Sequence, residues 1–296
     1  MGTLFVTLQY LLPHHLLCRL IHAVTRVRTP WIKNALIGAF MHAFQPDMRD
    51  AAQSEPLGYE SFNAFFTRAL KAHARPLDPE PHRIVSPCDG TLSIAGTLQA
   101  DQMVQAKGHR FGLNALLAAD APLSERLRDG RYATIYLAPY NYHRLHMPLS
   151  GRLRSAWHVP GRVFSVNRVT VSQVPGLFAR NERVVCVFDG EYGPFVVVLV
   201  GALFVGSMST VWHGDVTPWR GARHAPGPAP GTHSLTPIAG SDPWLPRGAE
   251  FARFNMGSTI VMLLPPGLAE WDAPLPPGLR VAVGQGLGSL IAPSLP

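Results

Sequence analysis

The chain has 296 residues, 26 of them Lys or Arg and 19 Asp or Glu, so its formal charge is +7. Hydrophobic residues make up 47% and charged residues 15%, which excludes a wholly disordered chain. The 27 glycines and 28 prolines exclude a helical bundle or coiled coil and favour strands joined by many turns.

The first 46 residues contain no Asp or Glu, and their pattern predicts two basic amphipathic helices. The uncharged run Met1–Cys18 is too short and too polar to span a bilayer, which needs about 20 apolar residues. Apolar side chains recur at helical spacing from Leu16 to Val24, and again from Ile32 to Phe44. Such helices suit an anionic membrane surface, but ordinary packing on a core explains the same periodicity, so the pattern leaves both open.

Further along the chain the pattern changes from helical to β-like. Ser61 can cap a helix predicted over Ser61–Lys71, and residues 113–127 predict one more helix. Stretches rich in Val, Ile, Tyr and Phe predict strands at 132–137, 183–188, 195–200 and 259–264. The Pro- and Gly-rich residues 214–248 predict a long surface loop. We therefore expect an α+β fold with a helical region over 1–75 and a predominantly antiparallel β core over 76–296.

Several motifs carry little weight. The Gly284–Gly288 stretch lacks the third glycine of a dinucleotide fingerprint. His143 and His146 are spaced like two metal ligands, but no third ligand stands out, so no metal is expected. Aromatic residues do not alternate with the basic residues, as they would in a groove that binds nucleic acid, so no nucleic-acid partner is expected either. Three widely separated cysteines form no disulfide framework, which indicates a reducing compartment.

Three local segments do suggest chemistry. Asp89 lies in a Pro/Gly turn, His143 and His146 follow a predicted strand, and Ser258 opens the last strong strand. Asp89, His146 and Ser258 supply the three groups of a nucleophilic triad, in which the acid orients the imidazole and the imidazole takes the hydroxyl proton. From these residues alone, a turn Asp, a pair of satisfied histidines and a turn Ser remain an alternative.

Seven short motifs together are more specific than any of them alone. They are Ser61-Phe-Asn-Ala-Phe-Phe-Thr-Arg68, Ala106-Lys-Gly-His109, Tyr142-His-Arg-Leu-His-Met-Pro148, Phe164-Ser-Val-Asn167, Leu177-Phe-Ala-Arg-Asn-Glu-Arg183, Val205-Gly-Ser207 and Met256-Gly-Ser-Thr259. With these motifs the sequence resembles the bacterial phosphatidylserine decarboxylases through nearly its whole length. Met256 stands where that family usually has Leu in a Leu-Gly-Ser-Thr cleavage motif, a swap that keeps an apolar side chain of similar volume.

The resemblance implies a proenzyme that cuts itself between Gly257 and Ser258. The products would be a β chain of residues 1–257 and an α chain of residues 258–296, which together form a heterodimer. Gly257 suits the position because a residue without Cβ permits a strained backbone and close approach to its carbonyl. Ser258 would become a covalent pyruvoyl group, the only cofactor implied. Its ketone would form a Schiff base with the substrate amine and accept the electrons released with CO₂.

The resemblance also implies a role for each candidate residue. His146 would be the general base for cleavage and Asp89 would orient it. His143 would assist the decarboxylation of phosphatidylserine to phosphatidylethanolamine, as proton donor or positioning group. Ser165 and Asn167 are candidates for contacting the lipid headgroup.

A lipid substrate implies a membrane partner. We expect residues 1–46 to dock on anionic lipid, which attracts each Lys or Arg by about 1 kcal/mol near the surface. The expected location is the cytoplasmic face of the cell membrane, as a peripheral protein, with assembly beyond the heterodimer left open. Three other functions remain as alternatives to phosphatidylserine decarboxylation. They are a pyruvoyl enzyme acting on another serine-bearing lipid or a soluble amino acid, a membrane-bound serine hydrolase that keeps Ser258 intact as its nucleophile, and a non-catalytic lipid-binding protein.

Overall fold

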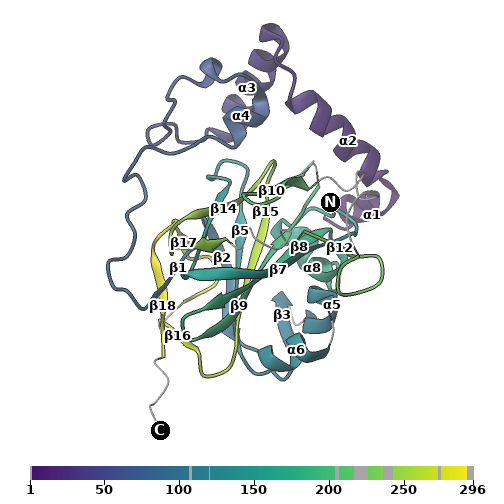
Figure 1. Ribbon diagram of the computed structural model, residues 1–296. Coiled ribbons are helices and arrows are strands. Elements are labelled where there is room, and N and C mark those ends of the chain that lie inside the picture. Colours follow the sequence, from purple (N-terminus) through teal and green to yellow (C-terminus); the bar gives the residue numbers. More distant parts are fainter. Residues whose placement is uncertain are drawn as a thin grey trace.

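The computed structural model describes residues 2–106, 109–119, 121–203, 207–216, 226–235, 243–272 and 275–291. Within these ranges the fold is the predicted α+β class, with four helices at the N-terminal end followed by a β-rich body (Figure 1). The strand pairs between named elements are antiparallel, as predicted.

The N-terminal helices extend along one side of the β body, and α3 and α4 lie together beyond its edge (Figure 1). They are α1 (Gly2–Leu11), α2 (His14–Thr25), α3 (Pro30–Phe44) and α4 (Phe62–Phe66), with a 3₁₀ turn η1 (Pro56–Gly58). The predicted amphipathic helices correspond to α2 and α3. Helix α1 was not predicted, because its almost wholly apolar sequence has no polar face to reveal a period. None of the described helices is long and apolar enough to cross a bilayer.

Two other predicted helices differ from the structure. The Ser61 hydroxyl caps α4 as predicted, accepting a hydrogen bond from Ala64 N at 3.1 Å. The helix stops at Phe66 rather than Lys71, because Leu70 instead forms a β-bridge with Ala51. The single helix predicted over 113–127 is two short helices. The chain turns at Ala118, which has a left-handed φ of 46°. The remaining helices are α5 (Leu113–Leu117), α6 (Ala121–Leu127), α7 (Arg168–Val171) and α8 (Leu177–Arg180).

The largest sheet carries the last strong strand at its centre. Among the described residues its order is β12-β7-β8-β9-β15-β5-β2-β17, with β13 also pairing with β7. Its members are β2 (Gly90–Thr97), β5 (Arg131–Leu137), β7 (Gly151–Val159), β8 (Arg183–Gly190), β9 (Gly193–Val200), β12 (His233–Ser234), β13 (Trp244–Leu245), β15 (Ser258–Leu264) and β17 (Arg280–Val281). Because β15 is buried on both faces, its apolar residues are nearly continuous rather than alternating. All four predicted strands lie in this sheet.

Smaller sheets complete the body. The sheet that contains His146 has the order β11-β10-β14-β6. Its strands are β6 (Arg144–His146), β10 (Met208–Thr210), β11 (Gly214–Val216) and β14 (Glu250–Phe254). The others are formed by β1 (Arg83–Val85), β16 (Ala269–Trp271) and β18 (Gly286–Leu290), and by β3 (Gln102–Ala106) with β4 (His109–Gly112). The predicted loop 214–248 thus contains short strands, while its residues 217–225 and 236–242 lie outside the described ranges.

Two apolar clusters meet beside the predicted cleavage site. The main core fills the β body, and a second cluster lies between α3 and α4. Its buried members are Ile37, Phe40, Phe62, Phe65 and Phe66. Met256 packs against both clusters, which places the residue before Gly257 at the junction of helices and sheets.

Candidate active site

Ser258 is the first residue of the central strand β15 and lies opposite Leu137 of β5. Its side chain is fully buried, and its Oγ has no hydrogen-bond partner among the described residues. A buried hydroxyl without a partner costs about 1–3 kcal/mol, which a purely structural serine would not need to bear. The Ser258 hydroxyl is therefore not committed to any structural contact with a described residue.

The histidine next to the predicted cleavage bond is His143. A Cβ built on Gly257 would lie 3.7 Å from His143 Cε1 and 3.5 Å from the Leu137 carbonyl. The His143 ring stacks on Phe66 with centroids 4.1 Å apart, and its Nε2 lies 3.3 Å from the Pro139 carbonyl. Its Nδ1 has no partner among the described residues. Burial lowers the pKa of His143 to about 3, so the ring is neutral near pH 7.

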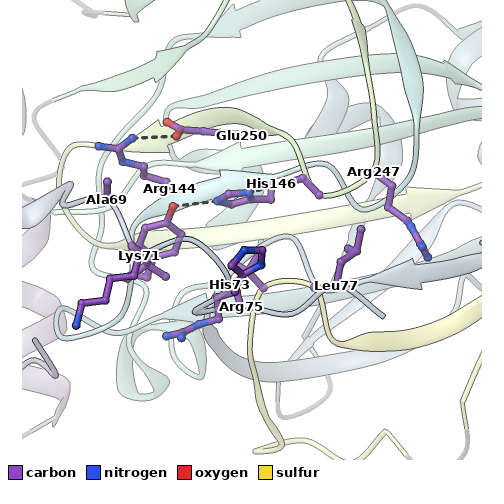
Figure 2. Close-up of a pocket in the computed structure, with 14 residues that line it drawn as sticks. Ala69, Lys71, His73, Arg75, Leu77, Arg144, His146, Arg247 and Glu250 are labelled. Carbon is purple, nitrogen blue, oxygen red and sulfur yellow. Dashed lines mark hydrogen bonds and ion pairs between the residues drawn. The ribbon is translucent and has the colours of Figure 1, made fainter. Parts of the chain in front are cut away.

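His146 faces the opposite way. Residues 142, 144 and 146 alternate along one face of the chain, and they line a cavity of about 360 Å³ (Figure 2). The His146 Nδ1–H donates to the Gly248 carbonyl at 2.7 Å, and Nε2 accepts from the Tyr142 hydroxyl at 3.0 Å. Burial is the main cause that lowers the pKa of His146, so this ring is also neutral near pH 7.

Asp89 is bound by an arginine that lines the same cavity. Arg75 donates from Nε to both carboxyl oxygens at 2.9 and 3.0 Å, and from Nη2 to Oδ2 at 2.6 Å. The Val283 N–H donates to Oδ1 at 2.9 Å. The His146 backbone N–H donates to the Pro87 carbonyl at 2.8 Å, so the turn that carries Asp89 runs alongside β6.

The structure thus groups the predicted residues into two pairs. Ser258 begins β15 with His143 beside the preceding residue, whereas His146 lines the cavity of Figure 2 and Asp89 is bound to Arg75, which lines the same cavity. Among the described hydrogen bonds, none joins Asp89 to the His146 ring or that ring to Ser258. In this uncut chain both ring nitrogens of His146 and both oxygens of Asp89 have other partners.

A second cavity, of about 280 Å³, adjoins the predicted cleavage bond. Its lining is mostly apolar and comes from both parts of the fold: Phe40, Phe44, Phe66, Tyr136, Leu137, Pro139, Ser165, Val166, Ala202, Leu203, Met256 and Gly257. Ser165 thus lies where a substrate contact is possible. Asn167 instead caps α7, accepting from Thr170 N at 3.0 Å and from Thr170 Oγ1 at 3.2 Å.

The expected conformational reason for Gly257 is not found. Its φ is not in the left-handed region, and a Cβ would make only ordinary contacts at 3.5 Å and beyond. Cys88, beside Asp89, is fully buried, and burial raises its pKa well above the usual value, so it stays a protonated thiol. Within the described ranges, no three or more His, Cys, Asp or Glu residues gather as metal ligands would.

Sequence analysis missed three residues of this site. Tyr142 and Phe66 lie inside the motifs quoted above, but only the fold shows that they contact His146 and His143. Arg75 belongs to no motif, and its contact with Asp89 could not be read from the sequence.

Comparisons of the sequence with known proteins identify its family. A sequence profile described as phosphatidylserine decarboxylase matches residues 62–289, and another described as PSD matches residues 4–45. Phosphatidylserine decarboxylase proenzymes of Stutzerimonas stutzeri and Azotobacter vinelandii are 49% and 48% identical over 96% of this chain, and the matches cover 94% and 97% of those proteins. That of Alkalilimnicola ehrlichii is 52% identical over 86% of either chain.

The fold, the site and these matches together define an enzyme of the carboxy-lyase class. The chain belongs to the phosphatidylserine decarboxylase family.

Proposed function

We propose that the chain converts phosphatidylserine to phosphatidylethanolamine through a pyruvoyl group that it makes from Ser258. The observation that carries the proposal is the buried Ser258 hydroxyl, which has no partner among the described residues and directly follows Gly257, a residue that lines a cavity and lies beside His143. An internal acyl shift needs a hydroxyl that can approach the preceding carbonyl, and the Ser258 hydroxyl has no hydrogen bond to a described residue that it would have to give up. The residues present therefore fit such a group at position 258.

Cleavage would use only groups of the chain and water. The Ser258 Oγ attacks the Gly257 carbonyl carbon, the C–N bond breaks, and the Ser258 nitrogen takes a proton while an ester replaces the amide. Loss of the Ser258 α-proton then expels the Gly257 carboxylate. Water hydrolyses the remaining dehydroalanine to a ketone and releases ammonia.

We assign the general base of this step to His146, with Asp89 as its orienting group. The neutral ring suits a base, because a ring protonated at pH 7 could not accept the hydroxyl proton. For this role His146 must exchange the Tyr142 contact for Ser258, and Asp89 must exchange part of its Arg75 contact for the ring. His143, already beside Gly257, is then free to serve the later decarboxylation.

A pyruvoyl ketone supplies an electron sink for the pair released when a carboxylate leaves as CO₂. The chain would contribute the surroundings of the reaction. His143 would act as proton donor or positioning group at the α-carbon of the substrate. Its Cε1 lies 3.7 Å from a Cβ built on Gly257. Phe66 would keep that ring in one orientation by stacking on it. The apolar cavity would exclude water.

The two product chains would stay together as a heterodimer. After cleavage, β15 would belong to the α chain, while its neighbours β5 and β9 would belong to the β chain. Since β15 is hydrogen-bonded along both edges and fully buried, separating the chains would expose the centre of the largest sheet.

A distinctive apolar surface supports a peripheral membrane location. Helix α2 turns His14, Cys18 and Thr25 inward, whereas Leu16 and Leu20 are 64% and 57% exposed. Leu11 and Trp31, on α1 and α3, are 78% and 75% exposed. Because Leu16 and Leu20 are not packed on the body, α2 supports the membrane explanation of its periodicity over the core explanation.

Vesicle binding tests this surface. Replacing Trp31 with serine should weaken binding to phosphatidylglycerol-containing vesicles about tenfold, because a large exposed aromatic side chain is lost. The matched control is Trp244→Ser, which removes another exposed Trp, on β13, and should change little. High salt should weaken wild-type binding, and binding that is equal in both variants and at all salt concentrations would contradict the assignment.

Selective inhibitors test the proposed function against the serine-hydrolase alternative. Hydroxylamine attacks ketones, so it should abolish the release of CO₂ from phosphatidylserine vesicles. A fluorophosphonate, which labels an activated serine, should leave the reaction unchanged, because Ser258 would no longer carry a hydroxyl. Inhibition by the fluorophosphonate alone would instead support a hydrolase.

A further inference from the structure

A network of buried hydrogen bonds holds the residues just before the Gly257–Ser258 bond. Its centre is Asn255, which is 1% exposed. The Asn255 side-chain amide donates to Ser207 Oγ at 2.6 Å and to Ser209 Oγ at 3.0 Å, and its backbone N–H donates to the Ser207 carbonyl at 3.1 Å. From the other side, Asn63 of α4 donates to the Asn255 carbonyl at 3.2 Å. Main chain and side chain are therefore both fixed.

The same two serines are held by the end of α2. Arg26, the C-terminal cap of that helix, donates from Nη2 to Ser207 Oγ at 3.2 Å and to Asp215 Oδ2 at 2.9 Å. Ser209 Oγ donates to the other carboxyl oxygen of Asp215. The hydroxyls of Ser207 and Ser209 thus connect Asn255 directly to the Arg26–Asp215 ion pair.

Only two residues separate Asn255 from Ser258. Ser258 is fixed in turn, because it begins β15 and pairs with Leu137. The reacting bond therefore lies between two fixed points, and a shift of Asn255 would move the Gly257 carbonyl relative to the Ser258 hydroxyl. A misplacement of about 1 Å can cost a reaction about 100-fold.

We propose that Asn255 is a positioning residue for self-cleavage, and that Arg26 holds it there through Ser207 and Asp215. Seating of α2 on the β10–β11 hairpin then sets the geometry of the Gly257–Ser258 bond. This inference rests on the self-cleavage proposed above. Because cleavage severs the chain between Asn255 and residue 258, the network should govern the cleavage rate and not the turnover of enzyme already cut.

The test compares two arginines of the same segment in the full-length chain. Arg26→Gln breaks the network. Arg28→Gln removes the same charge from an ion pair with Glu60 in which the Arg28 and Glu60 side chains are 75% and 61% exposed. We expect cleavage to be about tenfold slower in Arg26→Gln and unchanged in Arg28→Gln. Arg26→Lys, which keeps a cation for Asp215, should recover part of the rate. The kcat per cut molecule, measured at a saturating concentration of phosphatidylserine vesicles so that weaker docking of residues 1–46 does not lower it, should equal that of the wild type in all three.

A double-mutant cycle tests the connection itself. Asn255→Ala should slow cleavage about 10- to 100-fold, and the double variant with Arg26→Gln should be no slower than Asn255→Ala alone. If Asn255→Ala fails to fold, Ser207→Ala takes its place in the cycle, because it removes the hydroxyl that both residues bind. Equal rates for Arg26→Gln and Arg28→Gln, or a double variant slowed by the product of the single effects, would overturn the inference. A wild-type chain that is never cut would instead overturn the proposed function.

Discussion

Replacing His146 with alanine should leave the full-length chain uncut, whereas replacing His143 with alanine should allow cleavage but abolish decarboxylation. The first variant lacks the proposed general base for cleavage. The second lacks the His143 ring, which is proposed to act only after the ketone has formed. Without its general base, the acyl shift should slow by about 10²–10⁴-fold. Gel mobility of the purified variants measures cleavage, and CO₂ release from phosphatidylserine vesicles measures turnover.

The two variants also decide between the histidines. His143 is the ring beside Gly257, whereas His146 has both nitrogens occupied in the uncut chain. An uncut His143→Ala chain together with a normally cut His146→Ala chain would transfer the base role to His143. Because burial lowers the pKa of His146, the wild-type cleavage rate should fall with decreasing pH as the ring becomes protonated, with its midpoint below the ordinary histidine value of 6.5.

Replacing Ser258 with alanine should abolish both cleavage and decarboxylation, because the variant has neither the attacking oxygen nor the atoms from which the ketone is made. The fold should survive. Removing a buried hydroxyl without a partner leaves no other group unsatisfied, so unfolding free energy should stay the same or rise by up to about 1 kcal/mol. Thermal unfolding, intact mass and CO₂ release measure these three outcomes.

The neighbouring residue provides a matched control. Thr259 Oγ1 is also buried without a partner, one position along the same strand. Thr259→Val removes that hydroxyl and keeps the side-chain shape, so cleavage and turnover should stay close to wild type. Equal loss of activity in Thr259→Val and Ser258→Ala would show a general effect on packing and contradict a special role for Ser258.

Much of the β body could be predicted from the sequence, because buried central strands such as β15 consist of long β-branched and aliphatic runs. The ends of helices that depend on a single contact or turn could not be predicted from the sequence. Helix α4 ends at Phe66, four residues before Leu70 pairs with Ala51, and the break between α5 and α6 depends on a left-handed Ala118. Neither contact leaves a pattern in the sequence.

The site was predictable as a set of residues but not as an arrangement. His143 and His146 are three positions apart, a spacing that also fits one helical turn. In the structure His146 ends strand β6 and His143 directly precedes it. In an extended chain, side chains an odd number of positions apart lie on opposite faces. The partner of Asp89 is Arg75, from the segment that joins the helices to the sheets. Such long-range contacts depend on the whole fold.

The central claim is that the bond between Gly257 and Ser258 is cut and that residue 258 becomes a ketone. Intact mass spectrometry of the purified wild-type protein tests it most directly. We expect two chains, residues 1–257 and residues 258–296, with a smaller chain whose mass fits a pyruvoyl group and which resists N-terminal sequencing. A single species of full-length mass, in a preparation that releases CO₂ from phosphatidylserine, would contradict it.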